Sequence, residues 1–126
     1  MWIFLEGGRF LSLVADPNHG DMLLVRARLP GDIEVDFPDA KVQEHPLNED
    51  EPSAYRYTAQ VSRGAVLKAI AHELEDLHYS RFQQSVCNAN RVWATQQCDA
   101  VMQQAQETAR SGVQQHSLCY PPHLQE

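Results

Sequence analysis

Three arginines stand at alternating positions of two apolar segments, and their spacing is the best chemical signal in the chain. Arg26 and Arg28 lie in residues 22–29, and Arg56 lies in residues 54–61. Alternate side chains of a β-strand share one face, so the three guanidinium groups are expected on one face of a sheet. A guanidinium fork binds a carboxylate or a phosphate. The sequence therefore predicts an anion- or partner-binding site at Arg26, Arg28 and Arg56; pairing with the chain's own carboxylates is the alternative.

The other reactive side chains do not form an established catalytic or metal-binding pattern. His72-Glu73 is followed at the zinc-ligand spacing by Asp76 in place of a histidine, so the pattern of the zinc proteases fails. The cysteines are widely spaced, and the serines lack the glycine context of a hydrolase nucleophile. The sequence therefore predicts no catalytic residue, no metal site and no cofactor, and it favours a protein that is not an enzyme.

The charge balance excludes the classes of protein that bind polyanions. Ten Lys and Arg stand against 17 Asp and Glu, which gives a net charge of −7. Such a field repels nucleic acid and anionic membranes, and we expect neither as a partner. Residues 32–51 hold eight carboxylates and one cation, Lys41, which equals the whole net charge. Their segment 48–51 has two interpretations: a mimic of a phosphate backbone that occupies a cationic groove on another protein, or a solvated loop.

Cysteine usage and the first residues predict a cytoplasmic protein. Cys87, Cys98 and Cys119 are odd in number, so we expect free thiols and a reducing compartment, with Cys87 and Cys98 filling the core. The chain starts with an apolar segment that ends before Glu6-Gly7-Gly8. We expect this segment to be too short for a secretory signal or a membrane span.

The elements that position the arginines read as strands. Residues 2–5 and 10–15 are apolar runs joined by Gly7-Gly8, the pattern of a hairpin. Residues 22–29 and 54–61 alternate apolar and polar side chains, and residues 41–45 are expected as a short edge strand. A helical turn over residues 32–37 would be capped by Asp32. The alternation directs Val25, Tyr55 and Tyr57 toward the helices, away from the arginines.

Helices are expected to follow the strands. Ser62 reads as the N-cap of a helix over residues 63–77, and a second helical stretch begins near Ser80. A third helix is expected over residues 90–109. The apolar stripe of the first comprises Val66, Leu67, Ile70, Leu74 and Leu77; Phe82 and Val86 point inward from the second; the seam of the third comprises Trp93, Ala94, Cys98, Val101 and Ala105.

This order of elements predicts an α+β fold. We expect one domain over residues 1–110, with an antiparallel sheet of four to five strands and the C-terminal helices packed on one of its faces. Residues 111–126 are expected to be a flexible tail. Five aromatic residues would line a small pocket between sheet and helices or would simply fill the core: Tyr55, Tyr57, Tyr79, Phe82 and Trp93.

Six short segments carry a resemblance to a known family. They are residues 2–4, 10–16, 24–28 and 55–57, and finally 79–82 with Val92-Trp93. Over about residues 1–95 the chain resembles a family of small uncharacterised bacterial cytosolic proteins. The resemblance implies a bacterial cytosolic origin and a shared fold, and it brings no activity, cofactor or catalytic residue. The acidic segment 48–51 and the glutamine-rich end after Gln96 depart from the family.

Two functions remain open from the sequence. The first is a non-enzymatic bacterial cytosolic binding or interaction module, whose partner would be another protein; self-association is compatible with it. The alternative is a protein or enzyme that binds a small anionic ligand through the arginine face formed by Arg26, Arg28 and Arg56.

Overall fold

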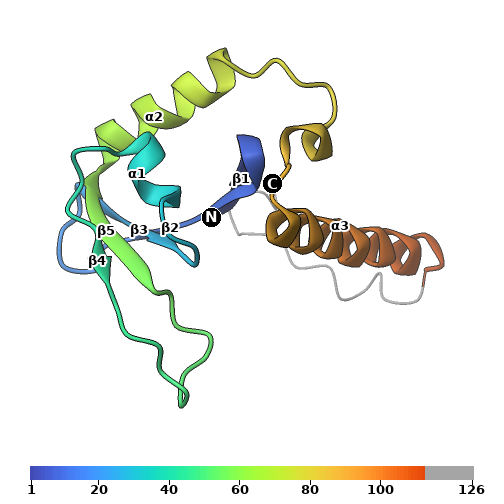
Figure 1. Cartoon of the computed structure of the whole chain (residues 1–126), viewed down its shortest axis with the longest axis horizontal. Helices are drawn as coiled ribbons and strands as arrows, with labels where there is room; N and C mark the ends of the chain where they lie inside the picture. Colours follow the sequence, from blue (N-terminus) through green and yellow to red (C-terminus); the bar gives the residue numbers. More distant parts are fainter. Residues whose placement is uncertain (113–126) are drawn as a thin grey trace.

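A five-stranded antiparallel sheet forms the body of the protein. The computed structural model describes residues 1–112. The strands are β1 (Trp2–Leu5), β2 (Arg9–Ala15), β3 (Met22–Ala27), β4 (Gln43–Glu44) and β5 (Tyr57–Ser62), in the spatial order β1-β2-β3-β5-β4. The helices are α1 (Asp32–Asp36), α2 (Arg63–Glu75) and α3 (Ala89–Arg110), with short 3-10 turns η1 (Glu6–Gly8) and η2 (Phe82–Ser85). The expected α+β class with an antiparallel sheet is confirmed (Figure 1).

Glycines make the tight turn of the first hairpin. Gly7 and Gly8 both have a φ of 85°, a backbone conformation that side-chain-bearing residues rarely adopt. A Cβ at Gly8 would also lie 3.0 Å from a methyl group of Val86. The turn therefore requires glycine for its conformation and at Gly8 also for space.

The core lies between one face of the sheet and helices α1 and α2. Leu11 pairs in the sheet with Ile3, and Leu13 pairs with Val25, which pairs in turn with Ala59. Directly paired residues of antiparallel strands share a face, so these side chains form one apolar layer. The most deeply buried members of the core are Leu11, Val25, Ala27 and Ile33, each at 0% exposure. The alternation predicted for residues 57–61 is confirmed, because Tyr57, Ala59 and Val61 are all buried.

Helix α2 begins as predicted but packs with less of its stripe. The Ser62 hydroxyl accepts a hydrogen bond from the Ala65 amide at 3.2 Å, which confirms the N-cap. Val66 is buried, whereas Leu74 is 66% exposed and Leu77 50%. Ile70 still packs against the core, and beyond it the helix meets the body through Glu73, which binds Arg9. A polar contact thus replaces the leucine packing that the periodicity predicted.

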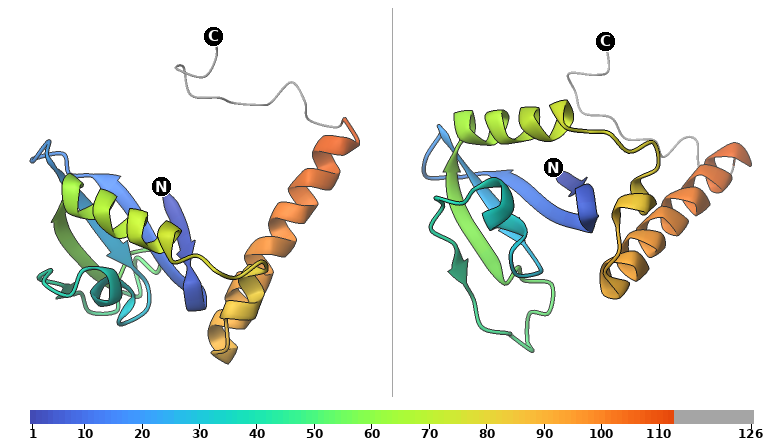
Figure 2. Two further views of the ribbon diagram at one scale, coloured as in Figure 1. Left: turned by 90° about the horizontal axis from the view of Figure 1, so that it is seen from above. Right: turned by 45° about the horizontal axis from the view of Figure 1, so that its top comes forward.

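Helix α3 departs from the prediction that the C-terminal helices pack on the sheet. Trp93 is 63% exposed, Val101 63% and Met102 66%, and the one buried residue of the helix is Thr95. The helix leaves the body near its N-terminus and projects away from the sheet (Figure 2). The expectation that Cys87 and Cys98 fill the core is also wrong, because both thiols are free and exposed. Nearly all of the predicted tail, and Cys119 within it, lies outside the described residues.

Candidate functional site

A buried ion pair fixes the first turn of α3 against the hairpin. The Asp32 carboxylate, 2% exposed, accepts hydrogen bonds from both terminal nitrogens of Arg91, at 2.7 and 3.1 Å, and one from the Phe10 amide at 3.1 Å. Arg91 also donates to the carbonyl of Gly8 at 3.1 Å. Asp32 was expected to cap α1, and that expectation is wrong: Gly31, which has no side chain, is the N-cap, and Asp32 is the first residue of the helix with its carboxylate bound to Arg91.

The turn η2 joins the hairpin to α3. The Ser85 hydroxyl accepts a hydrogen bond from the Gly7 amide at 3.1 Å, and Val86 is buried against Gly8. The side chain of Asn88 then caps α3 by accepting from the Arg91 amide at 3.1 Å. These bonds place α3 beside the outer face of the hairpin, on the side away from the core.

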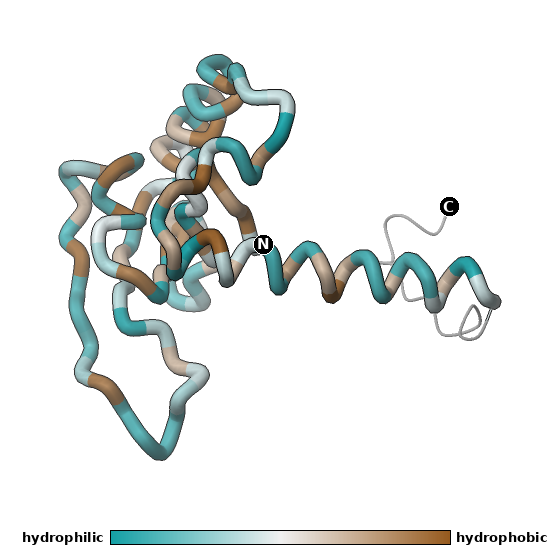
Figure 3. The backbone as a smooth tube through the Cα atoms, turned by 45° about the vertical axis from the view of Figure 1, so that its right-hand side comes forward, coloured by the Kyte–Doolittle hydropathy of each residue, from teal (hydrophilic) through white to brown (hydrophobic). Residues whose placement is uncertain are grey.

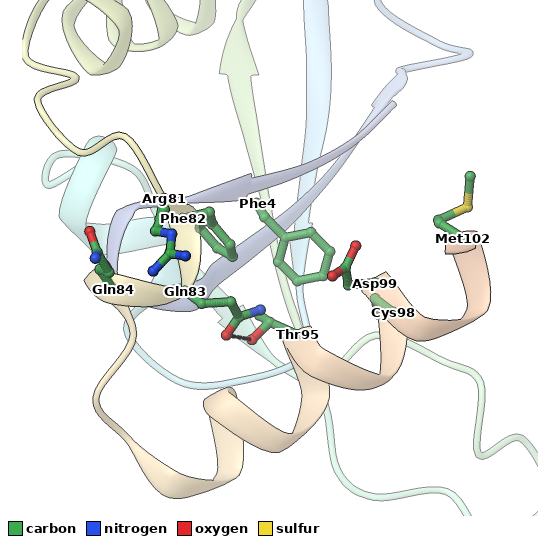
Figure 4. Close-up of a pocket in the computed structure, with 9 residues that line it drawn as sticks. All are labelled: Phe4, Arg81, Phe82, Gln83, Gln84, Thr95, Cys98, Asp99 and Met102. Carbon is green, nitrogen blue, oxygen red and sulfur yellow. Dashed lines mark hydrogen bonds between the residues drawn. The ribbon is translucent and has the colours of Figure 1, made fainter. Parts of the chain in front are cut away.

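An open apolar groove of about 730 Å³ lies between that face of the hairpin and α3. Phe4 points from β1 toward α3, and Phe82 of η2 lies beside it with ring centroids 6.1 Å apart (Figure 4). The opposite wall is α3. The residues that line the groove are Phe4, Arg81, Phe82, Gln83, Gln84, Thr95, Cys98, Asp99 and Met102. Phe4 and Phe82 on one wall, with Cys98 and Met102 on the other, thus give each wall an apolar part, and polar side chains complete the lining.

Aromatic side chains extend the floor of the groove across the outer face of the sheet. Phe10 lies between Phe4 and Trp2, with ring centroids 4.9 Å from Phe4 and 6.0 Å from Trp2. Trp2 is 75% exposed. Edge-on and tilted contacts of this kind hold the rings in place while their outer surfaces stay open to a ligand.

The polar groups of the groove do not form a reactive pair. The Thr95 hydroxyl lies 2.8 Å from the carbonyl oxygen of Arg91 and 3.2 Å from the side-chain oxygen of Gln83. Within residues 1–112, no cluster of three or more His, Cys, Asp or Glu side chains is placed to hold a metal ion. What the groove can do chemically is to desolvate and hold apolar side chains.

No family model, curated protein or solved structure matches this chain. The resemblance to a bacterial cytosolic family therefore stays a prediction. The candidate site rests on the geometry of the groove and on the charges around it.

Among the helices of residues 1–112, none has the length and apolar character needed to cross a membrane.

The structure brings two of the three predicted arginines together. The guanidinium carbons of Arg26 and Arg28 lie 4.5 and 4.0 Å from the centre of the Tyr55 ring. Arg56 binds Glu44 at 3.0 Å and the His45 carbonyl at 3.3 Å. The three guanidinium groups therefore do not point to one common binding site.

Tyr55 itself lies on the side of the arginines, so its predicted orientation toward the helices is wrong. Strand β5 begins at Tyr57, and the alternation that orients residues 57–62 does not extend back to Tyr55. Arg26 also donates to the Ser12 hydroxyl at 2.7 Å, and Arg28 donates to the Ser53 carbonyl at 3.0 Å. Arg26 and Arg28 thus bind the segment before β5 to the outer face of the sheet.

A second charged cluster joins β2, α1 and α2 on the core side. Arg9 donates to Asp36 and, at 2.7 Å, to Glu73. Burial, together with the hydrogen bond to Glu73, raises the pKa of Asp36 to about 6, although Arg9 opposes the shift. The hydrogen bond from Asp36 lowers the pKa of Glu73. The two carboxyl groups therefore share a proton under mildly acidic conditions, beside a permanently charged guanidinium.

Sequence reasoning found only part of the groove. Of the five aromatic residues expected to line a pocket, Phe82 does so, while Tyr57 is in the core and Trp93 is exposed on α3. Phe4 and Met102 were missed. One signal for Phe4 was available in the sequence: the first strand has apolar residues on both of its faces. This pattern is expected where both faces of a strand pack against other parts of a protein.

Proposed function

We propose that this protein is a non-enzymatic interaction module of the bacterial cytosol that binds an amphipathic helix of a partner polypeptide in the groove between the hairpin and α3. The observation that carries the proposal is the groove itself. Both of its walls carry apolar side chains, and it continues into a helix whose Val101 and Met102 are more than half exposed. An exposed apolar surface with a polar rim is typical of a protein-binding site.

The shape of the groove favours a helix as the ligand. One wall is the side of a straight helix of 22 residues, which offers its partner contacts at helical intervals. Hydrophobic residues recur along α3 among hydrophilic ones (Figure 3). Grooves of this kind take up the apolar face of an amphipathic helix in many recognition complexes. The free, exposed thiols of Cys87 and Cys98 support a reducing compartment.

The rim of the groove adds one preference. Arg81 and Asp99 lie at the groove with opposite charges. A partner helix with a carboxylate near Arg81 and a basic residue near Asp99 would match both, and such matching affects specificity more than affinity.

Selection from a displayed library of amphipathic helical peptides tests the proposal. The biotinylated protein is presented at nanomolar concentration, and the variant Met102→Glu serves for counter-selection because it places a charge in the groove. Gln96→Glu, at an exposed position on the far side of α3, is the matched control. We expect helices with an apolar stripe that bind the wild type and Gln96→Glu but not Met102→Glu. Recovery of no such helix, or of helices that bind all three proteins equally, contradicts the proposal.

A second candidate function is supported by the surroundings of Arg26. The Nε atom of Arg26 is buried and makes no hydrogen bond with any of the described residues. A buried donor without an acceptor costs free energy, and an anion bound beside Arg26 and Arg28 would supply one. We propose a single carboxylate or phosphate as the ligand there, since Arg56 is held by Glu44.

A further inference from the structure

We propose that the exposed face of α3 pairs with the α3 helix of a second copy of this chain, in antiparallel orientation. The inference deepens the proposed function, on which it rests for the groove, by naming the polypeptide that occupies it. It starts from the spacing of the apolar residues of α3 and from the charges beside them.

Apolar and weakly polar residues of α3 follow the spacing of a coiled-coil seam. They recur at alternating intervals of four and three: Ala94, Cys98, Val101, Ala105 and Thr108. This mean period of 3.5 residues keeps one stripe of a helix against a partner helix, whereas a helix that packs on a sheet needs no such regularity. Met102 lies beside the stripe and also lines the groove, so the seam and the groove are continuous.

The positions that flank the seam favour a copy of the same helix. Thr95 and Met102 lie on one side, and Gln97 and Gln104 lie on the other, so no charge borders the seam. Asp99 lines the groove and Glu107 lies behind the helix, so neither occupies a seam position or a position that directly flanks it. A protein of net charge −7 repels its own copies over most of its surface. This uncharged strip is where two copies approach without placing like charges in contact.

The antiparallel orientation follows from the position of the bodies. Each body is attached at the N-terminal end of its α3, so parallel helices would bring two acidic bodies together. Antiparallel helices separate the bodies and extend the free half of each helix toward the partner's groove. A twofold axis between Asp99 and Ala100 sets Cys98 opposite Val101 of the partner subunit, and Ala94 opposite Ala105 of the partner subunit.

The expected dimer is weak and reversible. A helix of 22 residues is about 33 Å long. A contact of two such helices, together with Phe4 and Phe82, buries about 1,200 Å², which is the lower end of specific interfaces. We therefore expect dissociation constants in the micromolar range, so that monomer and dimer are both populated in concentrated solution.

Sedimentation velocity over a range of micromolar concentrations tests the pairing. Val101→Asp places a charge in the seam, and Ala100→Asp places the same charge about 100° away around the helix, outside the seam and the positions that flank it. Wild type and Ala100→Asp should form dimers, and Val101→Asp should remain monomeric. Leu74→Asp adds a third variant, because the exposed leucines of α2 are the main competing apolar surface. A dimer lost in Leu74→Asp and kept in Val101→Asp overturns the proposal, as does a wild type that is monomeric throughout.

Cross-linking fixes the orientation. With the native cysteines replaced by serine, copies carrying Ala94→Cys are mixed with differently tagged copies carrying Ala105→Cys and oxidised mildly. We expect a disulfide between the two kinds of copy; disulfides only between identical copies overturn the antiparallel pairing. If library-selected helices bind a monomeric wild type, self-pairing fails while the proposed function stands. If neither pairing nor peptide binding is found, both fail.

Discussion

The body of the protein and the α3 arm use their apolar residues in opposite ways. In the body, Leu11, Val25 and Ile33 are fully buried between the sheet and α1. In the arm, Val101 and Met102 remain more than 60% exposed although the helix is regular. The difference indicates that the body folds on its own contacts, whereas the body leaves the apolar stripe of the arm largely uncovered.

The charged contacts show the same contrast. The Asp32–Arg91 pair is almost completely buried, with exposed fractions of 2% and 18%. On the arm, the Glu107–Arg110 pair is exposed at 61% and 77%, where ion pairs contribute little. The connection between body and arm thus depends on a few bonds at the first turn of α3.

Asp32→Ala should give the largest loss of stability. Arg91 would remain partly buried without its carboxylate, and the Phe10 amide would lose its acceptor. Removing one partner of a buried ion pair costs about 3 to 5 kcal/mol. Urea unfolding should show this loss, and amide exchange should show faster opening at the start of α3. Glu107→Ala is the control on the exposed pair; equal losses in the two variants would contradict the contrast between body and arm.

Truncations of apolar residues test the same contrast in the core. Leu11→Ala should cost about 2 to 5 kcal/mol, as is usual for fully buried leucines. Leu74→Ala and Val101→Ala should each cost less than about 1 kcal/mol in the monomer, because most of each side chain is already in contact with water. Chemical denaturation at low protein concentration measures all three. A cost for Leu74→Ala close to that of Leu11→Ala would show that α2 packs with its whole stripe.

These truncations also show how far the sequence could predict the structure. The strands were predictable because alternation at Tyr57, Ala59 and Val61 reports directly which side chains face the core. Ser62 was predictable as a cap because its bond to Ala65 is local. The packing of the helices was not, because periodicity shows that a stripe is apolar without showing what covers it. Leu74 and Val101 belong to stripes that the body leaves exposed.

The groove depends on contacts between residues far apart in the chain. Phe4 and Phe82 meet because Arg91 reaches back to Asp32 and Gly8, and no local signal predicts a pair separated in this way. The positions of Arg26 and Arg28 could be predicted from the sequence, but the ion pair of Arg56 could not. Strand alternation placed Arg26 and Arg28 correctly on the outer face, but the partner of Arg56, Glu44, comes from a two-residue edge strand whose register only the fold defines.

A smaller effect is expected from pH, on the core side of the body. Burial raises the pKa of Asp36 from its ordinary 3.8 to about 6, so the folded protein holds a proton that the unfolded chain has already released. The contribution of Asp36 to stability therefore falls as the pH rises through this range. The lowered pKa of Glu73 acts oppositely and only at more acidic pH.

Asp36→Asn should remove this dependence. The amide stays neutral at every pH and can still donate to Glu73. Between about pH 4.5 and about pH 7, the free energy of unfolding should therefore fall by about 1 to 2 kcal/mol less in the variant than in the wild type. Urea unfolding at the two pH values measures the difference. Asp39→Asn makes the same change at an exposed neighbour and should leave the dependence intact. A dependence unchanged in Asp36→Asn would show that the carboxyl is ionised in the fold.

The smallest effects are expected on the outer face, where the arginines test the second candidate function. The double variant Arg26→Gln, Arg28→Gln loses two guanidinium contacts with the Tyr55 ring and the bonds to Ser12 and Ser53. It should cost about 1 kcal/mol, since each of these contacts is weak and glutamine keeps a hydrogen-bond donor at both positions. Arg56→Gln removes the exposed ion pair with Glu44, the bond to the His45 carbonyl and a contact of 5.5 Å with the Tyr57 ring, and it should cost less because the ion pair is exposed to solvent. Titration with inorganic phosphate, followed by amide chemical shifts around Ser12 and Tyr55, should show saturable binding to the wild type and to Arg56→Gln. The double variant should not bind phosphate, because binding depends on the guanidinium groups of Arg26 and Arg28 beside the Tyr55 ring. Binding that persists in the double variant, or that disappears in Arg56→Gln alone, would place the anion away from Arg26 and contradict this site.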